Sequence, residues 1–113
     1  MIFLFQFDKS DDGIDFVLNE RIAEDMDTQS EELLGPLVFS TCQVLMHYKE
    51  ISKSDTIMSG MIVETDEFEV TLSEGLGQYI DPFTKNSILF ENAKIIADLL
   101  VEIMSRTNPS LTK

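Results

Sequence analysis

The feature that most constrains the fold is a strict alternation of apolar and polar residues over 67–72. Phe68, Val70 and Leu72 alternate there with two glutamates and a threonine. A period of two is typical of a strand with one buried face and one face in water. The apolar run 56–63 precedes it, so the two segments together predict an antiparallel β-hairpin whose apolar face needs a covering layer.

The hydrophobic pattern also predicts a register for this hairpin. With a two-residue turn at 65–66, Val63 would face Phe68 and Met61 would face Val70. Apolar side chains would then meet on one face of the hairpin, with the glutamates on the other.

A second hairpin is predicted at the start of the chain. Residues 2–7 are rich in aromatic and β-branched side chains, and the cluster 8–13 contains an Asp-Gly pair that suits a turn. Apolar residues then alternate with other side chains over 14–18, which indicates a second strand. The same residues also have helical spacing, so a helix over 14–26 is the competing interpretation.

Two signals predict how the central helix begins. Thr28 and Glu31 have the spacing of a capping box, in which Thr28 would cap the helix. Gly35-Pro36 follows, and proline suits the first turn of a helix far better than its interior. We therefore expect a short turn and then a main helix from Pro36 to about Ile51.

The last helix is expected from about Ser87 to Arg106. Its apolar stripe is wider than one face of a sheet requires. This width indicates either a central helix or a helix that also contacts a second subunit. The residues predicted for such an oligomer interface are Leu89, Ile96, Leu100 and Ile103.

The predicted order is ββαββα. It indicates an α+β two-layer sandwich, with an antiparallel sheet that carries its helices on one face. At 113 residues, of which 43% are hydrophobic, residues 1–113 are expected to form a single domain with one core.

Charge is distributed unevenly along this chain. It has 21 Asp and Glu against 8 Lys and Arg, a formal net charge of −13. Residues 1–32 hold ten acids and two bases, and residues 64–81 hold six acids and no base, whereas the remaining segments are close to neutral. Direct binding to nucleic acid is disfavoured, because phosphate backbones are bound by Lys and Arg. A basic partner protein is favoured instead.

Carboxylates spaced along a sheet can imitate the phosphates that a basic cleft normally binds. We therefore expect a partner such as a nuclease or another nucleic-acid-binding protein, blocked in the manner of an inhibitor or immunity protein. The residues predicted to contact it are Asp11, Asp12, Asp15, Glu64, Asp66, Glu67 and Glu69.

The sequence offers little for catalysis or metal binding, so neither an enzyme nor a cofactor is predicted. Cys42 and His47 are five residues apart, which points them in different directions on a helix. The string from Asp8 to Gly13 matches the opening of a calcium loop. Position 12 of that loop would be Asn19 instead of glutamate, so an acidic hairpin turn is the preferred interpretation.

The expected compartment is the cytoplasm. A single cysteine excludes a disulfide framework and fits a reducing environment. The apolar start over 1–7 lacks a basic region before it and runs into Asp8, unlike a signal peptide. No apolar stretch has the length of a membrane helix.

Two functions from different classes follow from these patterns. In the first, the chain is a non-enzymatic acidic protein that blocks a basic cleft of its partner. In the second, it is a homo-oligomeric structural or adaptor module, such as a dimer, assembled through the last helix, and the charge serves only to keep it in solution.

Overall fold

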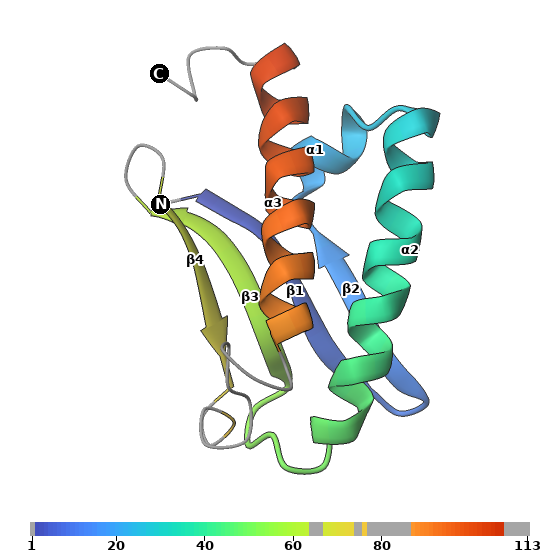
Figure 1. Ribbon diagram of the computed structural model, residues 1–113, viewed down its shortest axis with the longest axis vertical. Helices are drawn as coiled ribbons and strands as arrows, with labels where there is room; N and C mark the ends of the chain where they lie inside the picture. The colour runs from blue at the N-terminus through green and yellow to red at the C-terminus, as the bar shows by residue number, and fades with distance from the viewer. Residues whose placement is uncertain (1, 64–66, 74–75, 77–86, 108–113) are drawn as a thin grey trace.

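The protein is a four-stranded antiparallel sheet with helices packed on one face (Figure 1). The computed structural model describes residues 2–63, 67–73, 76 and 87–107. The strand order is β2-β1-β3-β4, which makes β2 and β4 the two edge strands. The elements in chain order are β1 Ile2–Ser10, β2 Gly13–Leu18, α1 Glu20–Glu24, α2 Thr28–Leu45, the 3-10 helix η1 Met46–Tyr48, β3 Thr56–Val63, β4 Glu67–Leu72 and α3 Ser87–Thr107.

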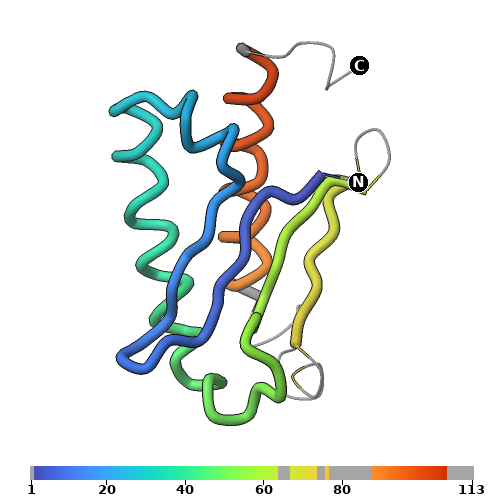
Figure 2. The backbone as a smooth tube through the Cα atoms, turned by 180° about the vertical axis from the view of Figure 1, so that it is seen from behind, coloured from blue at the N-terminus to red at the C-terminus, as the bar shows by residue number. Residues whose placement is uncertain are grey.

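The two long helices, α2 and α3, form the second layer. They lie side by side over the same face of the sheet, and none of the described residues forms a helix on the opposite face (Figure 2). This arrangement confirms the predicted α+β sandwich with antiparallel strands and helices on one face. None of the helices in the described part of the chain is both long and apolar enough to cross a membrane.

Aromatic side chains form the centre of the core on the covered face of the sheet. Phe5 and Phe7 on β1 are fully buried. The Phe7 ring centroid lies 5.0 Å from that of Phe16 on β2, and the Phe5 centroid lies 6.3 Å from that of Phe68 on β4. One aromatic cluster thus connects both edge strands through the centre of the sheet, and contacts at these distances add to the energy of burial.

The apolar residues of α3 complete this core from the helical layer. Leu89, Ile96 and Leu100 are fully buried, and Ile103 is 2% exposed. The width of the apolar stripe was compatible with a central helix or with contact to a second subunit. Packing against the sheet and α2 of the same chain accounts for it. These four residues are core residues and offer no surface to a second copy. An oligomer, if it forms, would need other side chains of α3.

The β3–β4 register differs by one residue from the prediction. Val63 lies opposite Glu67, and Ile62, not Val63, lies opposite Phe68. Because side chains alternate between faces, this shift moves Met61 and Val63 to the uncovered face. Gly60 and Ile62 occupy the core face instead, and both are buried. The predicted turn at 65–66 lies outside the described residues.

Gly60 is where the sheet makes room for its aromatic core. A Cβ atom placed on Gly60 would lie 2.6 Å from two ring atoms of Phe5 and 2.9 Å from a ring atom of Phe68. These distances are shorter than carbon atoms tolerate. Glycine therefore lets the two rings pack directly against the backbone of β3.

The first hairpin is confirmed, with longer strands than expected. β1 continues to Ser10, and β2 pairs with it from Gly13 to Leu18. The competing helix over 14–26 is wrong for its first half, but a short helix, α1, follows directly. Asn19 starts α1, because its side chain accepts hydrogen bonds from the backbone N–H groups of the next turn.

The beginning of α2 differs from the prediction in two respects. The capping residue is Asp27, one position before Thr28, and its carboxylate accepts a 2.7 Å bond from the Ser30 backbone N–H. The helix also runs unbroken through Pro36 to Leu45, where it was expected to begin at Pro36. Gly35 explains this continuity in part, since a residue without Cβ avoids the clash with the following proline ring.

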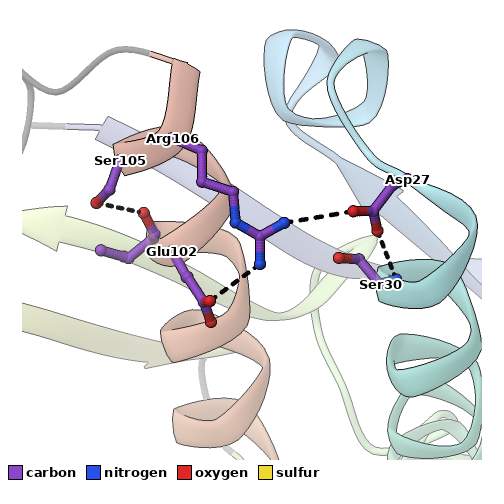
Figure 3. A network of polar contacts seen from close by, with 6 residues as sticks. Asp27, Ser30, Glu102, Ser105 and Arg106 are labelled. Atoms are coloured by element: carbon purple, nitrogen blue, oxygen red, sulfur yellow. Dashed lines mark hydrogen bonds and ion pairs between the residues drawn. The ribbon is translucent and has the colours of Figure 1, made fainter.

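A polar network connects the end of α3 to the start of α2 (Figure 3). The Arg106 guanidinium donates to Glu102 on its own helix at 2.9 Å and to the capping residue Asp27 at 3.3 Å. The hydrogen bonds from Ser30 and the positive charge of Arg106 hold the pKa of the Asp27 carboxyl below its ordinary value.

This network gives a pH-dependent prediction. Because the pKa of Asp27 is lowered by folding, its stabilising effect is present above the unfolded pKa and is lost as the pH falls through the folded pKa. We expect Asp27→Asn, which keeps a capping oxygen but removes the charge, to lower the melting temperature at neutral pH. The difference from the wild type should disappear in strong acid. A difference that is the same at every pH at which the protein remains folded would contradict this account.

Candidate functional site

The acidic residues predicted to bind a partner do not form one continuous surface. Asp15 lies on the edge strand β2, whereas Glu67 and Glu69 lie on the opposite edge strand β4. The side chains of all three residues are exposed on the uncovered face of the sheet. Glu64 and Asp66 lie outside the described residues.

The two groups occupy diagonally opposite corners of the sheet. Asp15 pairs with Asp8, near the end of β1. Glu69 pairs with Met61 on β3, and Met61 in turn pairs with Phe3, near the start of β1. Asp15 and Glu69 are therefore five residues apart along the strands and three strand spacings apart across the sheet. At about 3.3 Å per residue and 4.8 Å per strand, these separations are about 17 Å and 14 Å. The acidic groups therefore have different surroundings, and each is a separate candidate for binding.

The group at β2 lies beside a concave surface. Helix α2 lies alongside β2 (Figure 1). Side chains of these two elements line a groove of about 440 Å³. We call it the edge groove. Ile14 and Phe16 form its wall on β2. Its other lining residues come from α2 and are Glu31, Leu34, Gly35, Val38, Phe39 and Cys42.

The edge groove is almost entirely apolar, and one of its walls is unusually exposed. Phe39 leaves 65% of its surface in contact with water, although it lies on a long, packed helix. Beside it, a Cβ at Gly35 would meet no atom within 4 Å beyond its chain neighbours and the backbone of its own helix, so the wall is open there. Large exposed apolar side chains next to a groove are typical of surfaces that bind other molecules.

One carboxylate lines this apolar surface, and three more lie on the hairpin that forms one of its walls. Glu31 is part of the lining, Asp15 follows the lining residue Ile14, and Asp11 and Asp12 form the turn before β2. We call Asp11, Asp12, Asp15 and Glu31 the acidic rim. All four are exposed, and the groove lining contains neither Lys nor Arg.

Three basic side chains have hydrogen-bond partners of their own. Lys9 donates to the Ser52 carbonyl at 2.6 Å, and Lys49 donates to the Ser10 carbonyl. Arg106 binds Asp27 and Glu102, as described above. Both lysines are thus held at backbone carbonyl groups, and Lys49 lies at Ser10, the residue before Asp11 of the acidic rim.

The rim also affects the one cysteine of the chain. Partial burial, and then the negative charge of Asp15, raise the pKa of the Cys42 thiol above its ordinary value. The Sγ atom lies 4.0 Å from the Ile14 carbonyl oxygen, at the edge of a weak hydrogen bond. Such a thiol is mostly protonated at neutral pH and is a poor nucleophile.

We therefore expect Cys42 to react with iodoacetamide more slowly at neutral pH than a cysteine in an unfolded peptide. Asp15→Asn should speed the reaction, because it removes one of the two causes of the raised pKa. The alkylation rate as a function of pH, followed by mass spectrometry, measures this. A rate in the folded wild type equal to that of the peptide would contradict the assignment.

The other residues considered for catalysis or metal binding do not come together in one site among the described residues. His47 lies exposed on η1. The Asp8 carboxylate accepts hydrogen bonds from Gln6 at 2.9 Å and from Thr56 at 2.8 Å, on the uncovered face of the sheet. Among the described residues, no three His, Cys, Asp or Glu side chains come together as metal ligands would.

Sequence reasoning identified Asp11, Asp12 and Asp15 but not the edge groove. The rim residue Glu31 was missed because α2 was expected to begin only at Pro36. Phe39 lies inside the predicted helix, but its exposure beside β2 was not foreseen. A helix that runs through Pro36 places positions 31, 35, 38, 39 and 42 along one side. This spacing was the signal in the sequence from which the α2 wall of the groove could have been predicted.

Comparisons with protein-family models, with curated proteins and with solved structures find no match to this chain. A proposal for what this face binds therefore rests on the chemistry of the edge groove.

Proposed function

We propose that this chain is a non-catalytic acidic binding protein that attaches to a basic partner protein through the edge groove and its acidic rim. The observation that carries the proposal is the combination of the two features. An open apolar groove has Glu31 in its lining and Asp11, Asp12 and Asp15 on the hairpin that forms one of its walls, and its lining contains no Lys or Arg.

Each feature has a distinct physical role in such binding. Complementary charge speeds the encounter and selects basic partners, but exposed ion pairs contribute little to affinity. Apolar side chains in the centre of an interface hold the complex together once water is excluded. Phe39 supplies an aromatic side chain of the kind that is frequent in such centres.

The partner class that best fits this surface is a protein with a cationic, nucleic-acid-type cleft. Such a cleft holds Lys and Arg in positions that bind phosphates. The carboxylates of the acidic rim carry the same sign of charge as phosphates and would compete with nucleic acid for those side chains. The expected consequence is inhibition of the partner.

The test is capture of partners from the lysate of the native host at low salt, followed by competition. We expect a basic nucleic-acid-binding protein to be retained and then released by double-stranded DNA. The triple variant Asp11→Lys, Asp12→Lys, Asp15→Lys should lose it, because reversed charges repel a cationic cleft.

The matched control is the double variant Glu67→Lys, Glu69→Lys, which reverses exposed charges at the opposite corner of the same sheet. Binding that survives in the control and is lost in the triple variant supports the proposal. Capture that is the same in wild type and triple variant, or that DNA does not affect, would remove it.

A homo-oligomeric adaptor is the second candidate. The observation that favours it is on α3, where Ile88 and Ile95 are 42% and 50% exposed although neighbouring residues are buried. The mass in solution, measured at low and high salt, tests it. A dimer that resists salt and dissociates with Ile95→Lys would support this function, and a monomer under both conditions would exclude it.

A further inference from the structure

We propose that the partner contributes an extended segment, with basic and apolar residues in alternation, that adds to the free edge of β2 as a fifth strand. This inference rests on the proposed function and specifies how the edge groove would be filled. It starts from the position of β2, which among the described residues pairs with a strand along one side only, that of β1. Apart from this pairing, the Ile14 carbonyl has the weak contact with the Cys42 Sγ atom described above.

An edge strand has unpaired backbone N–H and C=O groups along its outer side. Peptides that add to such an edge gain affinity from main-chain hydrogen bonds and specificity from pockets for alternate side chains. β2 has six residues in regular antiparallel pairing, from Gly13 to Leu18. This length is sufficient to pair with one further strand.

The surroundings of β2 define which side chains an added strand needs. Ile14 and Phe16 point to the core face, where they line the edge groove with Phe39. Asp15 and Val17 point to the uncovered face. Because an added strand also alternates, one set of its side chains would enter the groove and the other would lie beside Asp15.

Charge complementarity selects a basic partner segment over a second copy of this chain. Two copies paired edge to edge would bring two acidic rims together, and the chain has a net charge of −13. Opposed like charges in adjacent strands are destabilising, whereas Lys or Arg beside Asp15 forms a favourable cross-strand pair. Apolar residues at the alternate positions would cover Phe39 and fill the groove.

The experiment uses two synthetic peptides of the same composition. In one, lysine and valine alternate, and in the other the lysines and valines are grouped in two blocks. We expect the alternating peptide to bind the full-length protein at least about tenfold more tightly. Fluorescence anisotropy with labelled peptide measures both dissociation constants.

Main-chain pairing is tested by N-methylation of the alternating peptide. An antiparallel edge exchanges hydrogen bonds with every second residue of its neighbour. Two peptides methylated at alternate amides in opposite phase should therefore differ. One phase should abolish binding, and the other should retain it. Equal effects of the two phases would overturn the strand geometry.

Two pairs of protein variants serve as controls. Phe39 and Leu33 are both exposed on α2, but Leu33 is not part of the groove lining. Phe39→Ser should therefore weaken binding of the alternating peptide, and Leu33→Ser should not. Asp15→Lys should weaken binding, whereas Glu67→Lys at the other edge should leave it unchanged.

The possible failures are distinguishable. If both peptides bind equally well and Asp15→Lys abolishes both, strand addition is overturned while charge-directed binding stands. If neither peptide binds but the captured partner still depends on Asp11, Asp12 and Asp15, strand addition is again overturned and the proposed function stands. If partner capture is indifferent to those three residues, the proposed function fails whatever the peptides do.

Discussion

Gly60→Ala is expected to destabilise the protein severely. The added methyl group would lie 2.6 Å from two ring atoms of Phe5 and 2.9 Å from Phe68. Phe5 is fully buried and also contacts the rings of Phe7 and Phe16. It cannot move without disturbing the rest of the aromatic cluster. Overpacking of this kind costs about 1–3 kcal/mol, and sometimes more.

Gly13→Ala is the matched control for this prediction. Gly13 also lies in a strand of the same sheet, but nothing lies within 4 Å of where its Cβ would be. Its stability should change by less than about 0.5 kcal/mol. Urea unfolding followed by circular dichroism measures both variants. Equal stabilities would contradict the close packing of the rings on β3.

Leu100→Ala is expected to destabilise the protein strongly. Leu100 is fully buried, so its removal leaves a cavity between the helix and the sheet. Leu→Ala at such positions costs about 2–5 kcal/mol, a large fraction of the stability of a small domain. The free energy of unfolding from a urea titration measures this loss.

Ile95→Ala provides the comparison on the same helix. Ile95 is 50% exposed, so its truncation should change the stability by less than about 0.5 kcal/mol. The pair also separates the core from a self-association surface. If Leu100→Ala were harmless to folding and instead dissociated an oligomer, the assignment of Leu100 to the core would be wrong.

The fold was predictable where a long pattern repeats without interruption. The alternation over 67–72 is long enough to exclude a helical period, and the apolar stripe from Ser87 is long enough to exclude the period of a strand. The resulting α+β sandwich is confirmed, and the strands over 56–63 and 67–72 match the structure.

Two details were decided by forces that the pattern does not contain. The register of β3 and β4 depends on the contact of Gly60 with Phe5, which lies 55 positions away in the sequence. The continuity of α2 through Pro36 depends on packing of the whole helix against the sheet and α3, and on Gly35 before the proline. Tertiary contacts of this kind override local preference.

The candidate site was predictable only in part. Net charge located the acids of the N-terminal segment, since charge is read directly from the sequence. The edge groove required the packing of α2 beside β2, two elements that lie on opposite sides of α1 in the chain. The separation of Asp15 from Glu69 followed from strand order, which periodicity does not determine.

The most direct test of the central claim is a map of backbone amide chemical shifts in the full-length protein during titration with the alternating lysine–valine peptide. The proposed binding face predicts that the largest changes occur in β2 and along α2 from Glu31 to Cys42, with the β4 amides little affected. Changes concentrated at Glu67 and Glu69, or on the exposed side of α3 around Ile95, would contradict the assignment of the edge groove and its acidic rim as the binding site.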